Sequence, residues 1–348
     1  MTSRERVIFA LSRLPVDRVP RDLWVDPAIH ATVGEEVTEL QSRYPPDLEC
    51  VPFEYPRNEK GRGRAQQGGR YSDDWGCVWE VQTPGSPPRL VQSPLADSSH
   101  LAKYRPPFEL LKRCSLHSVN HVCAESSRFV LAVSATEPFR RLCYLRGRQT
   151  AWNDLHRGSK TVRKILEVIH QFNCRDMEMW GASDVDGVVI RDILGHENAT
   201  IAPEVWADYF LRLYREYCEI LHKADKFVFV VFEGNIAPIL PELRKVGVDA
   251  VALDCRSADL EGLIRQYSKE VCFWLHFGAG ALGSTQQLSE VRDLVRKVRL
   301  TSDPSRGGLL VRGTWLAGTR FQNLATFFEY WLEPESALAV ERPASSSS

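Results

Sequence analysis

The sequence lacks the features of several large protein classes. No apolar run approaches the roughly 18 residues that a membrane-spanning helix needs. The formal net charge is -1, with 44 basic against 45 acidic residues, so the overall charge favours neither nucleic acid nor an anionic membrane. We therefore predict no nucleic-acid partner and no membrane partner.

Paired cysteines are also missing. The 9 cysteines are odd in number, and no two have the Cys-x-x-Cys spacing. This pattern is typical of reduced cytosolic thiols and argues against a disulfide framework or a structural zinc site. The first residues, MTSRERVIFALSRLP, are charged and contain no apolar signal region. We expect a cytoplasmic protein.

Glycine patterns that bind nucleotides are absent from the ends of the predicted strands. Neither GxGxxG nor a Walker pattern occurs there, which argues against a nucleotide-binding doubly wound sheet. The stretch RNEKGRGRAQQGGRY has arginines and glycines, but no strand leads into it, so we interpret it as a solvated hairpin or loop. If it instead forms a lid over an active site, Arg62, Arg64 and Arg70 become ligand contacts.

The composition that remains is that of a globular protein. Hydrophobic residues make up 43% and charged residues 26% of 348 positions, which is enough material for a full core. This length fits either two domains or one large barrel. Residues 21–107 are rich in Pro, Gly and Arg and are predicted to be irregular, and residues 336–348 are predicted to form a disordered tail.

Strands and helices alternate from Phe129 onward. Continuous apolar runs typical of buried strands lie at 129–136, 184–192, 226–234, 248–254, 270–280 and 307–314, and amphipathic helical segments separate them. Short connections between such elements indicate a parallel sheet. We predict a single (β/α)8 TIM barrel over residues 1–335, in which segments such as 18–25 and 122–133 supply the remaining strands.

Polar residues follow several of these strands, where a barrel places its active site. They are Asp192, Glu233, Asn235, Asp254, His276 and Arg312. A buried Glu233 would have a raised pKa suited to acid–base chemistry. The alternative is that Glu233 pairs with an arginine such as Arg312.

The other strand-end residues also have two interpretations each. Asp192 either faces substrate or pairs with Arg191, and Asn235 either contacts substrate or caps the next helix. His276 is either a substrate contact or a core histidine. Arg312 offers a planar fork for a carboxylate or phosphate, or it pairs with Glu233 or Asp254.

Six segments occur in a fixed order and carry a family resemblance. They are SRERVIFALSRLPVDRVPRDLW, YSDDWGCVWE, SPLADSSHLAKYRPP, LCYLRGRQTAWNDL, DVDGVVIRDILG with IAPEVW, and EGNIAPILPELRKVGVDAVALD. Together they resemble the uroporphyrinogen decarboxylase superfamily over roughly residues 2–331. The resemblance implies a TIM barrel and one of two activities: cofactor-free decarboxylation of uroporphyrinogen, or zinc-dependent methyl transfer with a corrinoid protein. The segment pattern is more similar to the methyltransferase-like branch.

The residues that bind zinc in the methyltransferase branch are replaced in this chain. That branch has His-x-Cys-Gly before Gly-Asn-Ile, and the matching residues here are Val231, Phe232, Glu233 and Gly234. The family's third ligand is a cysteine near the last strand, and the sequence there reads VRGTWLAGT. Catalytic zinc needs three protein ligands, and Glu233 with His276 could supply only two. We therefore expect no metal cofactor.

The decarboxylase branch also has a signature that this chain lacks. It reads R-Q-A-G-R-Y-L-P-E, and its arginines hold substrate carboxylates, whereas this chain has GRGRAQQGGRYSDD. Asp73 and Asp74 resemble a family aspartate that accepts hydrogen bonds from pyrrole N–H groups. The other interpretation is a turn acid that binds its own backbone.

The sequence leads to one main hypothesis and two alternatives. The main hypothesis is metal-independent decarboxylation of an anionic tetrapyrrole-like small molecule, with Glu233, Asp192 and Asp74 as catalytic acids. Substrate contacts would then come from Arg312, His276, Asn235 and Asp254. The alternatives are a methyltransferase that needs a corrinoid protein as its partner, and a barrel that binds a ligand without catalysis. Oligomeric state is not predicted.

Overall fold

The computed structural model describes residues 1–56, 68–196, 199–257, 259–302 and 306–332. These residues form two compact units. The first contains residues 1–49, 127–129 and the described residues from 249 to 332, and the second contains residues 50–126 and 130–248. The predicted tail at 336–348, and Arg62 and Arg64 of the predicted loop, lie outside the described residues.

The first unit is built on four parallel strands with helices beside them. The strands pair in the order β1 (Arg21–Val25), β13 (Leu309–Trp315), β12 (Cys272–Phe277) and β11 (Ala250–Asp254). The helices are α1 (Ser3–Leu11), α2 (Pro27–Arg43), α11 (Leu260–Tyr267), α12 (Ala279–Leu282), α13 (Leu288–Ser302) and α14 (Phe321–Tyr330). A short strand, β2, covers Leu48–Cys50.

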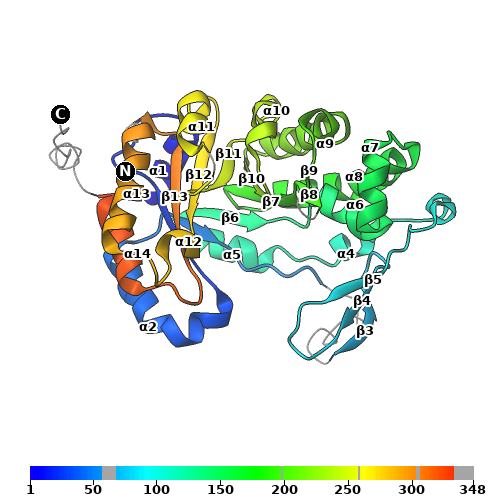
Figure 1. The fold of residues 1–348 in the computed structure, drawn as a ribbon, viewed down its shortest axis with the longest axis horizontal. Helices are drawn as coiled ribbons and strands as arrows, with labels where there is room; N and C mark the ends of the chain where they lie inside the picture. Colours follow the sequence, from blue (N-terminus) through cyan, green and yellow to red (C-terminus); the bar gives the residue numbers. More distant parts are fainter. Residues whose placement is uncertain (57–67, 197–198, 258, 303–305, 333–348) are drawn as a thin grey trace, which may run out of the picture. The chain divides into compact units, whose positions relative to one another are not determined.

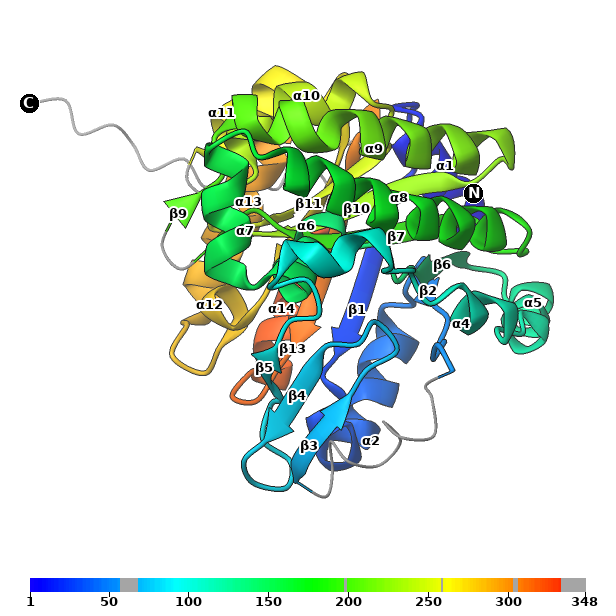
Figure 2. The ribbon, with the colours of Figure 1, turned by 90° about the vertical axis from the view of Figure 1, so that its right-hand side faces the viewer.

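The second unit has three parallel strands in the order β10 (Phe227–Glu233), β7 (Gly187–Ile193) and β6 (Phe129–Val133). Its helices are α4 (Phe108–Lys112), α5 (His117–Glu125), α6 (Pro138–Arg146), α7 (Arg148–His156), α8 (Lys160–Gly181), α9 (Pro203–Lys223) and α10 (Leu240–Lys245). A small antiparallel sheet joins β3 (Gly69–Ser72), β4 (Val78–Val81) and β5 (Arg89–Gln92), which are drawn in blue to cyan in Figure 2.

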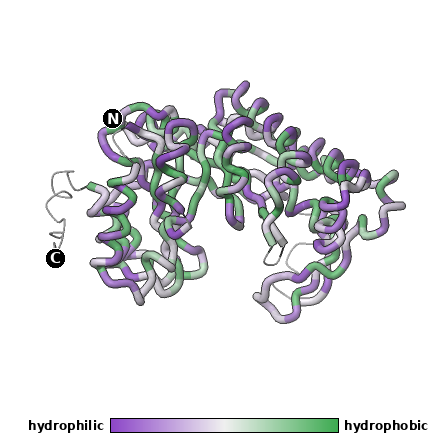
Figure 3. The backbone as a smooth tube through the Cα atoms, turned by 45° about the horizontal axis from the view of Figure 1, so that its top comes forward, coloured by the Kyte–Doolittle hydropathy of each residue, from purple (hydrophilic) through white to green (hydrophobic). Residues whose placement is uncertain are grey.

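The strand and helix boundaries follow from local sequence. The parallel strands are apolar almost throughout, and all four residues from Phe129 to Ala132 are buried. Helix α1 begins with a capping box in which Thr2 accepts the backbone N–H of Glu5, and Glu5 accepts that of Thr2. In Figure 3 hydrophilic and hydrophobic residues alternate along the longer helices, as expected for helices with one buried face.

The fold class is the predicted (β/α)8 TIM barrel. Its eight strands are β1, β2, β6, β7, β10, β11, β12 and β13. Of the described helices, none has the length and apolar character required to cross a membrane.

The segment 21–107 is more regular than the sequence predicts. It contains strand β1, as expected from residues 18–25, but also the 17-residue helix α2 and the small antiparallel sheet. Helix α2 was missed because Gly34 and several β-branched residues weaken its helical pattern. Its start is nevertheless encoded locally, since Asp26 accepts the backbone N–H of Ala28 and Pro27 occupies the first turn. The segment 122–133 supplies strand β6 only from Phe129, after helix α5.

Candidate functional site

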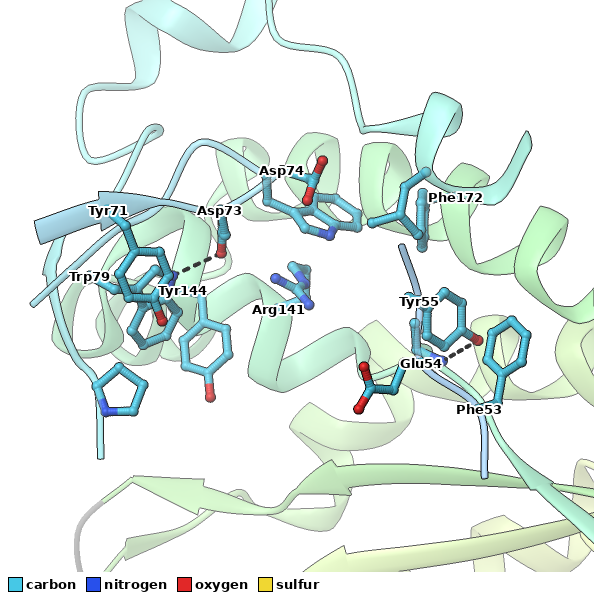
Figure 4. A pocket seen from close by; sticks show the side chains of 14 residues that line it. Phe53, Glu54, Tyr55, Tyr71, Asp73, Asp74, Trp79, Arg141, Tyr144 and Phe172 are labelled. Atoms are coloured by element: carbon cyan, nitrogen blue, oxygen red, sulfur yellow. Dashed lines mark hydrogen bonds between the residues drawn. The ribbon is translucent and has the colours of Figure 1, made fainter. Parts of the chain in front are cut away.

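A pocket of about 820 Å³ lies within the second unit and has mainly aromatic walls. Figure 4 shows the guanidinium of Arg141 in the middle of this pocket, with Tyr144, Trp79 and Tyr71 on one side and Tyr55 and Phe53 on the other. The remaining lining residues are Glu54, Asp73, Asp74, Trp75, Pro88, Leu110, Ala135 and Phe172. Its volume and its aromatic lining are typical of a small-molecule site. We call it the aromatic pocket.

The residue at the centre of the pocket is held by an acid and two rings. Arg141, on helix α6, donates from Nη2 to Glu137 at 2.8 Å. Its guanidinium carbon lies 4.6 Å from the centroid of the Trp75 ring and 5.7 Å from that of Tyr144. Such stacking on aromatic faces is favourable for arginine. A guanidinium has five N–H donors, so a pocket ligand with a carboxylate can bind here as well.

The two aspartates of the loop between β3 and β4 have different surroundings. Asp73 accepts the backbone N–H of Cys77 and the indole N–H of Trp79, both at 2.9 Å. It therefore shapes its own turn, as in the second interpretation made from sequence. Asp74 also lines the pocket, and Arg113 donates to it at 3.4 Å. Asp74 is thus the aspartate of this pair that remains a candidate for ligand binding.

A buried acid lies behind the opposite wall of the pocket. The hydroxyl of Tyr55 donates to Asp176 at 2.6 Å and accepts N–H groups of Trp180 (2.8 Å) and Ala135 (2.9 Å). Asp176 also accepts the Thr136 hydroxyl at 3.0 Å. Burial raises the pKa of Asp176 to about 6. This network fixes the Tyr55 ring, so we regard Asp176 as a positioning residue.

A second, smaller pocket of about 340 Å³ lies at the start of helix α6 and shares Tyr144 with the aromatic pocket. Glu137 forms ion pairs with both Arg140 (3.3 Å) and Arg141 (2.8 Å), and burial raises its pKa. Arg140 in turn donates to Glu233. The sequence analysis missed Glu137, although it follows the strand at 129–136 and the strand-end argument would have nominated it.

The hydrogen bonds of Asp192 explain why an acidic residue lies near the end of strand β7. Only 2% of its surface is exposed, and its carboxylate accepts the backbone N–H groups of Phe139 and Arg140 at 2.8 Å. It also accepts the hydroxyl of Tyr214 at 3.2 Å. These bonds satisfy the free N–H groups of the first turn of α6. Arg191 is exposed, and the predicted alternative of an Arg191–Asp192 pair is not among the contacts of the described residues.

Glu233 and Asn235 lie at the end of β10, as predicted. The Glu233 side chain is 72% exposed and pairs with Arg140, so this carboxylate is not buried. The alternative of an arginine partner is the one observed, with Arg140 in place of Arg312. Asn235 accepts the backbone N–H of Ala237, two residues on, at 3.1 Å and so forms an Asx turn. The short 3-10 helix Ala237–Ile239 that follows has Ile236 as its N-cap and no side-chain cap.

The remaining candidates form a row within the first unit. Asp254, His276, Arg312 and Asp22 occupy matching register positions on four neighbouring parallel strands, β11, β12, β13 and β1. Arg312 donates from Nε to Asp22 at 2.5 Å, and its guanidinium carbon lies 3.8 Å from the Trp274 ring centroid. Asp22, the observed partner of Arg312, was not predicted. It lies inside the strand expected at 18–25 and not after it, so the strand-end argument did not select it. We call these four residues the polar row.

The other two members of the polar row are His276, which is partly exposed, and Asp254, which is exposed. The His276 ring packs edge-on against Trp274, with 4.7 Å between ring centroids. Asp254 is exposed and accepts the backbone N–H of Arg256 at 2.8 Å. The first unit therefore brings together three predicted residues, and the second unit holds Asp74, Asp192, Glu233 and Asn235.

Comparison with known proteins identifies the family that the sequence resembles. Residues 72–276 match the model of the uroporphyrinogen decarboxylase (URO-D) family, which covers more than half of the chain. No curated protein matches the sequence.

The similar solved structures are distant in sequence. A methyltransferase from Methanosarcina mazei is 12% identical with a TM-score of 0.70, over 95% of this chain and 98% of that chain. A sugar phosphate isomerase/epimerase from Parabacteroides distasonis is 9% identical with a TM-score of 0.42, over 89% of this chain and 93% of that chain. The first of these supports the barrel fold.

Proposed function

Because the chain belongs to the uroporphyrinogen decarboxylase family, we propose that it removes a carboxyl group from a pyrrole-type acid bound in the aromatic pocket. The observation that carries this proposal is the position of Arg141 among aromatic side chains in a pocket that Asp74 also lines. A cation and a carboxylate acceptor are thus available to one flat ligand.

Each group in the pocket has a distinct task in this proposal. Arg141 holds the substrate carboxylate by charge-assisted hydrogen bonds, and Glu137 keeps its guanidinium stacked on Trp75. Asp74 accepts the ring N–H and stabilises the cationic ring that forms when a ring carbon is protonated. The proton comes from solvent and adds to the ring carbon that bears the carboxylate. The C–C bond to the carboxylate then breaks, its electron pair returns to the ring, and carbon dioxide leaves, so that the proton replaces the carboxylate.

The charges that line the pocket favour particular substrates. Glu54, Asp73 and Asp74 supply three carboxylates, whereas Arg141 is the cation that lines this pocket. A ligand that places many carboxylates here would meet net repulsion. We therefore propose a substrate that presents one carboxylate at a time to Arg141.

The proposal is tested by anaerobic incubation with uroporphyrinogen and with a monopyrrole carboxylate, read by mass spectrometry for loss of carbon dioxide. We expect Arg141→Gln to raise KM and to lower kcat/KM at least tenfold. The matched control is Arg148→Gln, which changes an exposed arginine on helix α7. Unchanged substrate in both incubations, or equal activity of the two variants, would contradict the proposal.

Methyl transfer remains the second candidate, because a solved structure with the same fold is called a methyltransferase. The residues that match the family's zinc pattern do not fit a metal at the end of β10. Val231 has no ligand atom, and Glu233 is paired with Arg140. We derive no step through zinc there. Loss of the methyl–cobalt absorption of methylcobalamin on incubation with the protein and a thiol would favour this candidate over decarboxylation.

A further inference from the structure

Three side chains of metal-binding type meet between helices α8 and α9, which pack against each other in the second unit (Figures 1 and 2). His170 and Cys174 are four residues apart on α8, so they lie on the same face of that helix. Glu216 reaches them from α9. The ligand atoms of all three residues lie within 4.8 Å of one another.

Two of the three distances between these groups are close to those of a tetrahedral zinc site. The Cys174 sulfur lies 3.6 Å from His170 Nε2 and 3.6 Å from Glu216 Oε1. It also lies 3.7 Å from His170 Nδ1, so binding of a metal at Nε2 would require the Cys174 side chain to turn toward that nitrogen. Zinc bonds of about 2.3 Å to sulfur and about 2.0–2.2 Å to nitrogen and oxygen place neighbouring tetrahedral ligands about 3.3–3.7 Å apart. His170 Nε2 and Glu216 Oε2 are 2.9 Å apart, so a metal would have to separate these two groups by about 0.5 Å.

The histidine is held by further buried groups. Its other ring nitrogen, Nδ1, lies 3.1 Å from the hydroxyl of Tyr217, which also accepts the side-chain N–H of Asn173 at 3.1 Å. His170, Asn173 and Tyr217 are each no more than 3% exposed. A hydrogen bond at one ring nitrogen orients the ring and leaves the other nitrogen as the ligand, as in known zinc sites.

Solvent can reach the three ligand atoms. They line a surface pocket of about 880 Å³, and Cys174 and Glu216 are partly exposed. Glu178 follows Cys174 by four residues and lines the same pocket, so it or a water molecule can occupy the fourth position. Three cations line the same pocket, Lys112, Arg175 and Arg212. Arg212 lies 3.6 Å from Glu216, but its shorter ion pair is with Glu167 at 3.0 Å. Lys112 pairs with Glu109 at 2.6 Å, and the Arg175 guanidinium stacks on the Phe108 ring at 4.2 Å.

We propose that His170, Cys174 and Glu216 bind a zinc ion that links helix α8 to helix α9. Nitrogen, thiolate and carboxylate together form a ligand set that zinc accepts, whereas magnesium and calcium prefer oxygen ligands alone. The proposal is independent of the proposed function. It also differs from the family's zinc pattern, which falls on Val231 and Glu233 at a strand end. The open fourth position leaves room for a water molecule or a thiol-containing ligand.

The test uses the full chain after removal of metal by a chelator. Equilibrium dialysis with zinc should give one tightly bound ion, and cobalt(II) should give the charge-transfer absorption of a thiolate–cobalt bond. Zinc should also raise the melting temperature, because it binds only the folded chain. We expect Cys174→Ser to weaken zinc binding at least tenfold and to abolish the cobalt–thiolate band.

Two further variants keep the test decisive. Cys114→Ser changes another partly exposed cysteine of the same unit and should bind zinc as the unmodified chain does. Glu216→Gln removes the charged ligand from a side chain that is 45% exposed, so the fold should survive, and zinc affinity should again fall at least tenfold. Binding that is absent in the unmodified chain, or equal in all four proteins, would overturn the proposal.

Discussion

The carboxylate of Asp192 accepts the backbone N–H of Arg140 at 2.8 Å, and so ties the end of strand β7 to the first turn of helix α6. Arg140 and its neighbour Arg141 therefore take their positions from a buried acid that does not line the aromatic pocket. The contact explains why a polar residue follows this apolar strand, and it makes the stability of the second unit sensitive to a single side chain.

Asp192→Asn should destabilise the protein by about 1–3 kcal/mol, because an amide nitrogen would face backbone N–H groups that need an acceptor. Burial raises the pKa of Asp192 from 3.8 to about 7. The folded state thus holds this proton more tightly than the unfolded state, so the associated stability is present below about pH 4 and is lost as the pH rises towards 7. Urea unfolding should show a larger advantage of the unmodified chain at pH 5 than at pH 8. An equal advantage at both values would mean that the pKa is not raised.

Arg312→Met should destabilise the first unit by about 3–5 kcal/mol, because it leaves the buried carboxylate of Asp22 without its partner. The double variant Asp22→Asn/Arg312→Met removes both charges and should recover part of this loss. Thermal unfolding of the single and double variants measures both effects. If Arg312 serves only to bind substrate, the single variant will keep its stability and will change only KM.

Glu233→Gln should change the free energy of unfolding by less than about 1 kcal/mol. The exposed carboxylate of Glu233 forms an ion pair with Arg140, and ion pairs of exposed groups contribute little to stability. The turnover of the same variant tests the catalytic role of Glu233. A strong loss of turnover with intact stability would establish the catalytic role predicted from sequence. Turnover like that of Glu219→Gln, an exposed glutamate on helix α9, would leave Glu233 with the ion pair as its role.

Tyr55→Phe should destabilise the wall of the aromatic pocket by about 1–3 kcal/mol, because Asp176, Ala135 and Trp180 each lose a partner. The Tyr55 hydroxyl lowers the pKa of Asp176, so its removal should raise that pKa further above 6. Unfolding measured across pH 5–8 tests both effects. Stability equal to that of the unmodified chain would show that the hydroxyl network contributes nothing.

The sequence by itself determined the barrel and most of its elements after Phe129. Continuous apolar runs such as residues 227–232 are typical of strands covered on both faces, and amphipathic helices between such runs favour a parallel sheet. Local signals also mark helix ends. Thr2 caps the start of helix α1, and Gly247, with a φ of 91°, follows the end of helix α10. The strand-end rule also selected residues that lie at strand ends in the structure.

Only the tertiary structure decided which of these polar residues are paired, buried or part of a pocket wall. Asp192 lies next to the end of strand β7 and Arg312 lies in the middle of strand β13. Their partners come from helix α6 and strand β1, which are far away in the sequence. Arg141, Tyr55 and Phe172 line one pocket although they come from three separate segments. Pairing and burial depend on contacts between segments that are distant in the sequence, and the type of a residue does not predict these contacts. For that reason the sequence predicted where chemistry is possible, and the fold determined which side chains are available for it.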